Sequence, residues 1–157
     1  MSMNKIESYK WAAKRTRAQV ERNENVVAIL ANTAAILKEY RPNFFWVGFY
    51  FVHPQNLILG PFQGPPACVK LSYDRGVCAA CAEKKMTIIV PDVHQFPGHV
   101  ACDSRSRSEI VAPVFDHQRV LRAVLDVDSI DLNDFDEHDV QGLEAIAGLL
   151  QPIWAAE

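Results

Sequence analysis

The four cysteines are the residues of this sequence best suited to chemistry. Cys102 lies in a polar stretch between His99 on one side and Arg105 and Arg107 on the other, and Cys78 opens a short predicted helix. A thiol at a helix N-terminus has a lowered pKa, and the thiolate is the form that acts as nucleophile or metal ligand. A free cysteine is otherwise a small hydrophobic core residue, a role that fits the polar neighbours of Cys102 poorly. We therefore expect Cys102 to be a reactive thiol.

The cysteines and histidines also admit a metal-binding interpretation. Cys78 and Cys81 have the spacing of a zinc-binding pair, and His94, His99 and Cys102 follow along the chain. The pair falls on a predicted helix and the sequence has no second close pair, so the indication of structural zinc is weak. The histidines can instead act as general bases, as activators of a thiol, or as hydrogen-bonding anchors of their loop.

Acidic and aromatic residues form two further groups. Asp126 and Asp128 alternate on a predicted strand and therefore point to the same face, and Glu109 begins the strand expected to pair with it. Such carboxylates can form a polar binding site, hold magnesium or calcium, or lie at a solvated strand end. Trp46 and Tyr50 share a face of another predicted strand, where they suit either core packing or a box around a small apolar or cationic group.

The elements that must position these groups follow from the hydrophobic pattern. We expect helix over 9–40, divided in two by capping residues at Asn23 and Asn25, and a long functional loop over 91–108. The other expected elements are strands over 44–52, 57–59, 67–71, 87–90, 109–115 and 119–127, a short helix over 77–85, and a last helix capped by Asn133 or Asp134. Strands that follow one another without regular intervening helices indicate an α+β domain rather than a doubly wound parallel sheet.

Composition limits the class of protein. A chain of 157 residues with 49% hydrophobic and 22% charged residues is typical of one globular domain. The net charge of −3 offers no basic field for nucleic acid. The sequence contains neither an apolar run long enough to span a membrane nor a start of signal-peptide type. We expect a soluble protein of a reducing compartment, most simply the cytoplasm, where thiols are more often catalytic, redox-active or metal-binding than structural.

The motifs between Trp46 and Ser129 closely resemble, in joint order and spacing, those of the free methionine-(R)-sulfoxide reductases, which are single GAF domains. They are WVGFY (46–50), LGPFQG (59–64), ACV (67–69), RGVC (75–78), PDVH (91–94), FPGH (96–99), ACD (101–103), SEIV (108–111) and LDVDS (125–129). The resemblance implies a single α+β GAF domain over 1–157 that often forms homodimers. Its mostly antiparallel sheet of about six strands, with the active-site loops, would occupy about 44–130, flanked by helices at about 5–40 and 134–151.

The resemblance also implies roles for individual residues. Cys102 matches the family's catalytic cysteine, Cys68 the usual resolving cysteine, and Cys78 a third cysteine that can take part in disulfide exchange. The residues that match the family's substrate pocket are the carboxylates Glu109, Asp126 and Asp128 and the aromatic residues Trp46 and Tyr50, which pack around the substrate methyl group and sulfur.

The implied reaction is the reduction of free L-methionine-(R)-sulfoxide without a metal or other cofactor. The Cys102 thiolate attacks the sulfoxide sulfur and becomes a sulfenic acid, which condenses with a nearby thiol, and a thioredoxin-type dithiol reduces the resulting disulfide. A carboxyl kept neutral by burial and crowding, for which Glu109 and Asp128 are the candidates, donates a proton to the departing oxygen, and another holds the α-ammonium group. The alternative is a non-catalytic GAF module that binds a small molecule or senses redox state, but such a module has no need of these cysteines and acids.

Several positions depart from the family pattern. Cys81 stands where a small residue is expected, and Arg105 and Arg107 stand where a small residue and an asparagine are usual. We expect the two arginines to raise the positive field near Cys102. Arg122 replaces an apolar residue on a strand and is expected to reach solvent.

Overall fold

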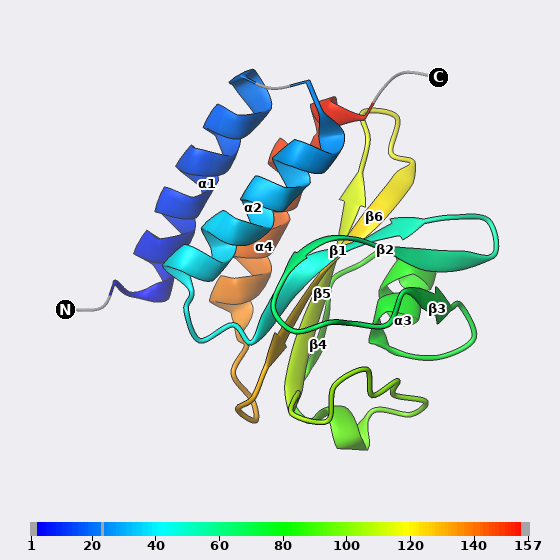
Figure 1. Ribbon diagram of the computed structural model, residues 1–157. Coiled ribbons are helices and arrows are strands. Elements are labelled where there is room, and N and C mark those ends of the chain that lie inside the picture. Colours follow the sequence, from blue (N-terminus) through cyan, green and yellow to red (C-terminus); the bar gives the residue numbers. More distant parts are fainter. Residues whose placement is uncertain (1–2, 23, 155–157) are drawn as a thin grey trace.

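A six-stranded antiparallel sheet forms the centre of the computed structural model, which describes residues 3–22 and 24–154 (Figure 1). Its strands are β1 (Trp46–Val52), β2 (Asn56–Gln63), β3 (Lys70–Ser72), β4 (Ile88–Val90), β5 (Ser108–Phe115) and β6 (Leu121–Ser129). They lie in the order β3-β2-β1-β6-β5-β4, and every neighbouring pair is antiparallel. The predicted α+β architecture with an antiparallel sheet of about six strands is therefore confirmed.

Helices cover the two faces of the sheet unequally. The helices α1 (Lys5–Arg22), α2 (Val26–Tyr40) and α4 (Glu137–Leu149) form a layer on one face, and the short α3 (Val77–Lys84) lies on the other (Figure 1). Two short 3₁₀ turns, η1 (Val93–Gln95) and η2 (Gln151–Ile153), complete the elements. None of the helices in the two described ranges is both long and apolar enough to cross a membrane.

Alternation along the strands divides the buried side chains between two cores. Val47 and Leu125 belong to the core beneath the three long helices, whereas Val111 and Val124 belong to the core beneath α3. The predicted site residues of β1, β5 and β6 alternate in step with the second of these cores and therefore lie on the face of the sheet that α3 covers. They are Trp46, Tyr50, Glu109, Asp126 and Asp128.

A buried polar contact joins the first helix to the last. Asp139 of α4 is fully buried and accepts a hydrogen bond of 2.7 Å from the Tyr9 hydroxyl of α1. Lys5 and Arg41 place cationic nitrogens 2.5 Å and 3.8 Å from the same carboxylate. Gly142 leaves the space for the Tyr9 ring, because a Cβ there would lie 2.2 Å from Tyr9 Cγ.

The predicted helix caps are partly right. Asn25 caps α2 by accepting a hydrogen bond from the Ala28 amide, as predicted, and Asn23 lies outside the described residues. The prediction for the last helix is wrong, because α4 begins at Glu137 and its cap is Asp136, whose side chain accepts from the backbone amides of His138 and Asp139.

The two residues predicted to cap α4 are occupied elsewhere. The Asp134 carboxylate accepts hydrogen bonds from the Ser129 hydroxyl at 2.6 Å and the Asn43 amide at 2.8 Å. Asn133 has a positive φ of 51° and donates its backbone N–H to Pro91. Both residues therefore close the turn after β6 rather than open a helix.

The segment before β3 also differs from the prediction. A strand is expected over 67–71, but residues 64–69 are irregular and β3 begins only at Lys70. Pro65 and Pro66 carry no backbone N–H to donate to a neighbouring strand, which delays regular pairing. This irregular segment carries Cys68.

Candidate active site

A cavity opens on the α3 face of the sheet, between the first turn of α3 and the two loops that carry Cys68 and Cys102. It encloses about 630 Å³ of empty space, counting its open mouth. Most of the residues with predicted roles line it: Trp46, Tyr50, Cys78, Cys102, Glu109, Asp126 and Asp128, together with His99. The structure thus brings into one place residues from three strands, a helix and a loop.

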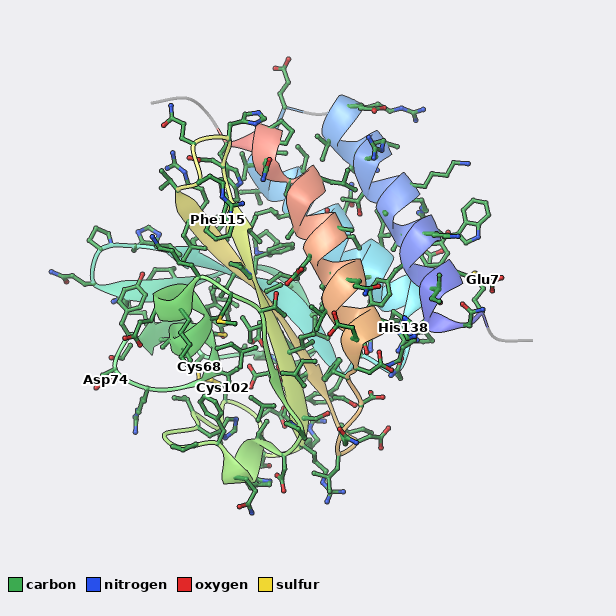
Figure 2. All side chains as sticks on the ribbon, turned by 180° about the vertical axis from the view of Figure 1, so that it is seen from behind. Glu7, Cys68, Asp74, Cys102, Phe115 and His138 are labelled. Carbon is green, nitrogen blue, oxygen red and sulfur yellow. A yellow bond between two sulfur atoms is a disulfide. The ribbon has the colours of Figure 1, made fainter. Side chains whose placement is uncertain are left out.

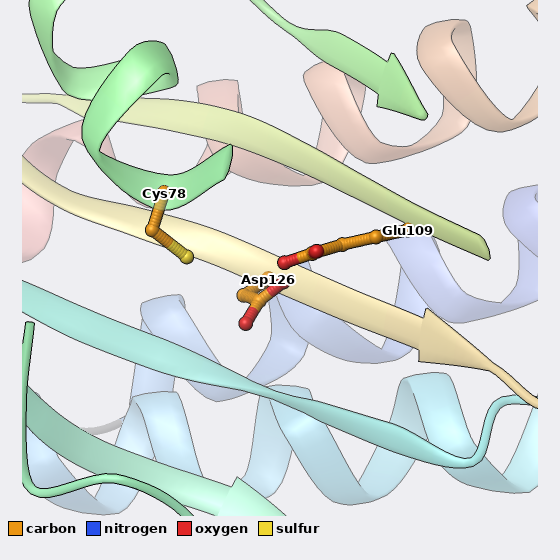
Figure 3. A group of neighbouring side chains, drawn as sticks. All are labelled: Cys78, Glu109 and Asp126. Carbon is orange, nitrogen blue, oxygen red and sulfur yellow. The ribbon is translucent and has the colours of Figure 1, made fainter. Parts of the chain in front are cut away.

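Three carboxyl groups form the floor of this cavity. Glu109 of β5 pairs with Asp128 of β6, and Asp126 pairs with Gly48 of β1, so the acids occupy adjacent rows of the sheet. Glu109 and Asp126 are each only 6% exposed, whereas Asp128 is partly exposed. Figure 3 shows the carboxyl groups of Glu109 and Asp126 turned toward each other, with the Cys78 side chain beside them. The predicted common face of the acids is confirmed.

Burial raises the pKa of all three acids, and the charges of neighbouring acids add to the shift at Glu109 and Asp128. Burial, followed by the charges of Asp126 and Asp128, raises the pKa of Glu109 well above its usual range. Burial raises the pKa of Asp126, and hydrogen bonds with Glu109 and Cys78 partly oppose that rise. Burial also raises the pKa of Asp128, and the charge of Asp126 adds to that shift. In the part of the chain that the structure describes, no lysine or arginine forms an ion pair with any of the three. All three carboxyl groups therefore hold their protons more tightly than a solvated carboxyl does.

One oxygen of this cluster has no partner within the protein. Oδ1 of Asp126 is buried and makes no hydrogen bond, although Asp126 lines the cavity. A buried carboxylate oxygen without a donor is costly, so its donor is expected to come from whatever occupies the cavity. The imidazole of His99 lies beside the cluster, with its Nε2 4.0 Å from Glu109 Oε2.

A disulfide joins Cys68 to Cys102, across a sequence separation of 34 residues and a Cα–Cα distance of 5.5 Å. The two labelled cysteines lie side by side at the α3 side of the sheet in Figure 2. Cys102 lines the cavity, and both cysteines are half-buried. The structure therefore represents the oxidised state, with the catalytic candidate already bonded to its predicted partner.

Two glycines allow the Cys102 loop to pack on the beginning of α3. Gly98 has a φ of 74°, and a Cβ there would lie 3.2 Å from Arg75 Cβ. Gly76 has a φ of 95°, and its Cβ would lie 3.3 Å from Val100. Positive φ and close approach both favour glycine. The long segment predicted to be functional is thereby folded back over the sheet to the cavity.

The aromatic wall of the cavity includes Trp46 and Tyr50, which belong to a stack of three rings completed by Phe62, a residue outside the cavity lining. Trp46 lies between Tyr50 and Phe62, with ring centroids 5.9 Å and 5.3 Å apart. Trp46 Nε1 donates a hydrogen bond of 3.1 Å to the Pro65 carbonyl. A Cβ on Gly48 would lie 2.4 Å from Phe62 Cβ, so glycine is needed there for the stack to form. Trp46 and Tyr50 both pack in the core beneath α3, which is one of the two predicted alternatives, and both also line the cavity.

The expectation of a low pKa for Cys78 is wrong. Cys78 is 5% exposed, and burial together with the charges of Asp126 and Glu109 raises the pKa of its thiol well above the usual range. Cys81 is fully buried, and burial raises the pKa of its thiol to about 12. Both are free thiols in this structure. They resemble core residues more than nucleophiles.

The metal-binding alternatives are rearranged by the fold. Among the described residues, one group of metal-ligating side chains converges, with ligand atoms within 4.8 Å of one another: Cys78, Glu109 and Asp126. It is neither the cysteine–histidine set nor the three-acid set considered from the sequence. Cys102 is committed to the disulfide and is not available as a thiolate ligand in this state.

The basic residues near Cys102 are neutralised within their own loop or turned to solvent. Arg105 forms an ion pair of 2.7 Å with Asp103, which lowers the pKa of that carboxyl to about 2, and its guanidinium lies over Phe45. Arg107 is exposed. The expected positive field from Arg105 is therefore largely balanced by Asp103.

The remaining predicted residues have local roles. His99 is partly buried, and burial together with the charge of His94 lowers its pKa. The two imidazole rings lie 6.5 Å apart. Arg122 is partly exposed and forms an ion pair of 2.8 Å with Asp116 at the far end of the β5–β6 hairpin.

Sequence reasoning missed Ser106. It is 7% exposed, lines the cavity and forms a hydrogen bond with Asp128 that opposes the rise in the pKa of that carboxyl. Its position in a run of alternating serine and arginine suggests only a solvated loop. No signal in the sequence distinguishes it from Ser104 and Ser108.

Comparisons with known proteins place this geometry in a family. The GAF domain model matches residues 21–151. The chain is 39% identical to the free methionine-R-sulfoxide reductase of Escherichia coli over 153 residues, which cover 98% of this chain and 92% of that one. The chain is also 39% identical to the Saccharomyces cerevisiae enzyme of that name over 133 residues, which cover 80% of this chain and 74% of that one.

Solved structures agree. The free methionine-R-sulfoxide reductase of Neisseria meningitidis, in complex with its substrate, superimposes with a TM-score of 0.90 at 43% identity, covering 96% of this chain and 90% of that one. The reduced form of the Staphylococcus aureus protein gives a TM-score of 0.85 at 41% identity, covering 91% and 92%. The chain therefore belongs to the GAF-domain family, in the group of the free methionine-(R)-sulfoxide reductases.

Proposed function

We propose that this protein is an oxidoreductase that reduces free L-methionine-(R)-sulfoxide to L-methionine. The observation that carries the proposal is the Cys68–Cys102 disulfide beside a cavity with an acidic floor and an aromatic wall. The similarity to reductases of that name over nearly the whole chain supports it.

The cavity suits an amino-acid substrate with a small apolar end. The unpaired carboxyl cluster attracts the α-ammonium group, and the buried Oδ1 of Asp126 accepts a hydrogen bond that the ammonium can donate. The stacked rings of Trp46 and Tyr50 offer an apolar surface for the methyl group and sulfur. A methionine sulfoxide inside a peptide lacks this ammonium group, which is the physical reason to expect selection for the free amino acid.

The first chemical step is attack of the Cys102 thiolate on the sulfoxide sulfur. The sulfoxide oxygen needs a proton as negative charge develops on it, and the raised pKa of Glu109 favours the protonated carboxyl that can donate it. The oxygen is transferred to Cys102, which is oxidised to a sulfenic acid, while the sulfoxide is reduced to the thioether of methionine. Asp128, the next acid in the row, is the second candidate donor.

The second step forms the disulfide seen in the structure. The Cys68 thiol displaces hydroxide from the sulfur of the Cys102 sulfenic acid, a proton joins it, and one water leaves. A thioredoxin-type dithiol then exchanges with the disulfide, is itself oxidised, and returns both thiols. Cys78 takes part in exchange only when its proton is removed, since burial holds it in the thiol form.

Location and assembly belong to the same proposal. A compartment that keeps thiols reduced, such as the cytoplasm, supplies the dithiol that the cycle consumes. A homodimer is proposed from the resemblance alone.

The test is an assay with separated substrates. The protein, with thioredoxin or dithiothreitol as reductant, is incubated in turn with the free R-epimer, the free S-epimer and a peptide-bound sulfoxide, and the methionine formed is measured. We expect turnover of the free R-epimer only. Equal turnover of all three would refute the substrate assignment, and binding of the sulfoxide without any methionine would favour a non-catalytic sensory module.

Three cysteine variants test the assigned roles. Cys102→Ser should abolish methionine formation, and Cys68→Ser should slow thioredoxin-dependent turnover more than a single turnover of the reduced enzyme. Cys81→Ser is the matched control, because Cys81 is buried, outside the cavity lining and without a role in the cycle. Full activity of Cys102→Ser would overturn the mechanism, and a requirement for stoichiometric zinc would replace it with a metal-dependent one.

A further inference from the structure

We propose that Tyr50 is a positioning residue for the disulfide-forming step, because its hydroxyl holds the Cys68 segment within reach of Cys102. The inference rests on the proposed function and adds to it a role for an aromatic residue otherwise assigned only to substrate. It concerns the hydrogen bond from the Tyr50 hydroxyl to the Cys68 backbone carbonyl rather than the aromatic ring of Tyr50.

The segment that carries Cys68 has little regular structure to hold it in place. Residues 64–69 lie between β2 and β3 without belonging to either strand. Two of the hydrogen bonds that reach its backbone come from side chains of β1. Trp46 Nε1 donates to the Pro65 carbonyl at 3.1 Å, and the Tyr50 hydroxyl donates to the Cys68 carbonyl at 2.9 Å. The first contact lies three residues before the cysteine, and the second is on the cysteine itself.

Tyr50 is a rigid point from which to hold this segment. It lies in the middle of β1, where its backbone pairs with Val124 on one side and Leu59 on the other. Its side chain is 2% exposed and its ring stacks on Trp46. The sheet therefore holds the Tyr50 hydroxyl in place, and the hydroxyl in turn holds the Cys68 carbonyl through their hydrogen bond.

The chemical consequence falls on the second step of the cycle. When the Cys68 thiol attacks the sulfur of the Cys102 sulfenic acid, one S–S bond forms, one S–O bond breaks and water leaves. The rate and equilibrium of ring closure depend on how often the two sulfur atoms meet, which is their effective concentration. Without the Tyr50 hydrogen bond, the Cys68 segment of the dithiol form samples more conformations, and closing the disulfide costs more conformational entropy. The disulfide form also loses a stabilising contact. Both effects lower the effective concentration.

The experiment measures that effective concentration directly, without substrate. The reduced protein is equilibrated with mixtures of reduced and oxidised glutathione, and the Cys68–Cys102 disulfide is quantified by acid quenching and mass spectrometry. Wild type is compared with Tyr50→Phe, which keeps the ring and removes only the hydroxyl. Tyr73→Phe is the matched control, because its hydroxyl donates to the His53 carbonyl at 2.6 Å and Tyr73 does not line the cavity.

We expect Tyr50→Phe to lower the effective concentration about fivefold, the factor that one net hydrogen bond supplies, and Tyr73→Phe to leave it unchanged. An unchanged value in Tyr50→Phe, or equal losses in both variants, would overturn the proposal. If Tyr50→Phe does not fold by circular dichroism, Trp46→Phe replaces it, since it removes the hydrogen bond to Pro65 from the same segment.

The outcome is separable from that of the proposed function. Glutathione exchange needs no sulfoxide. If the wild-type protein fails to produce methionine, the proposed function is overturned, but the equilibrium constants for disulfide formation in wild type and Tyr50→Phe still decide the role of Tyr50. In an active enzyme, the same variant should also allow a sulfenic-acid trap such as dimedone to capture more Cys102 after one equivalent of substrate. Equal capture in wild type and Tyr50→Phe would count against the positioning role.

Discussion

Reduction of the Cys68–Cys102 disulfide should destabilise the fold by an amount that its position predicts. The bond closes a loop with a sequence separation of 34 residues. In the chain-entropy model, a loop of that length removes about 12.6 cal/mol/K of entropy from the unfolded chain, which corresponds to about 3.8 kcal/mol at 25 °C. For a chain of this size, about 2–4 °C of melting temperature accompanies each kcal/mol, so the reduced protein should melt about 8–15 °C below the oxidised protein.

The assay is a pair of thermal melts, one of the oxidised protein and one in the presence of a phosphine reductant, with free thiols counted before each. Cys68→Ser cannot form the bond, so its melting temperature should not depend on the reductant. Cys81→Ser should retain the full difference, because Cys81 is a free buried thiol. A difference of less than about 2 °C between the two wild-type samples would refute the reasoning, since the chain-entropy term would then be absent.

Three further perturbations test the site and its support. Glu109→Gln should lower turnover at least about 100-fold by removing the proton donor. Glu109→Gln should also melt at a higher temperature than wild type, by an amount that grows as the pH rises above the usual pKa of a glutamate. The raised pKa of Glu109 makes the folded state bind a proton that the unfolded state releases there, so wild-type stability falls as the pH rises. Gly48→Ala should cost about 1–3 kcal/mol in denaturant unfolding and raise KM, because its Cβ would lie 2.4 Å from Phe62 Cβ. Tyr9→Phe should cost about 1.5–3 kcal/mol without changing turnover, since buried Asp139 loses a hydrogen bond far from the cavity.

The parts of the site that follow strand alternation could be predicted from the sequence. Asp126 and Asp128 share a face because side chains alternate along a strand, and their pairing with β5 brings Glu109 beside them. Trp46 and Tyr50 share the corresponding face of β1 for the same reason. These predictions needed only the identity of the strands and the short hairpin between β5 and β6.

The parts that depend on competition for hydrogen bonds could not be predicted. Asp134 has the residue type and spacing of a helix cap, but Ser129 and Asn43 bind its carboxylate, and Asp136 caps α4 instead. Arg105 has the charge to influence Cys102, but Asp103 lies two residues before it and forms the ion pair. In both cases the local pattern is sound, and the partner that the side chain actually binds decides its role.

Cys78 shows how magnitude decides which of two opposing effects controls a thiol. Its place in the first turn of α3 favours the thiolate by about 0.3–1 kcal/mol, which is less than one unit of pKa. Burial of an ionisable group among carboxylates opposes this with shifts of up to about 3–5 units. The sequence reveals the first effect, because helix position is local. The second depends on where β5 and β6 place Glu109 and Asp126 relative to the helix. The acids that we propose to bind an ammonium group therefore also keep Cys78 protonated, and the proposed redox chemistry falls to the two cysteines on the loops.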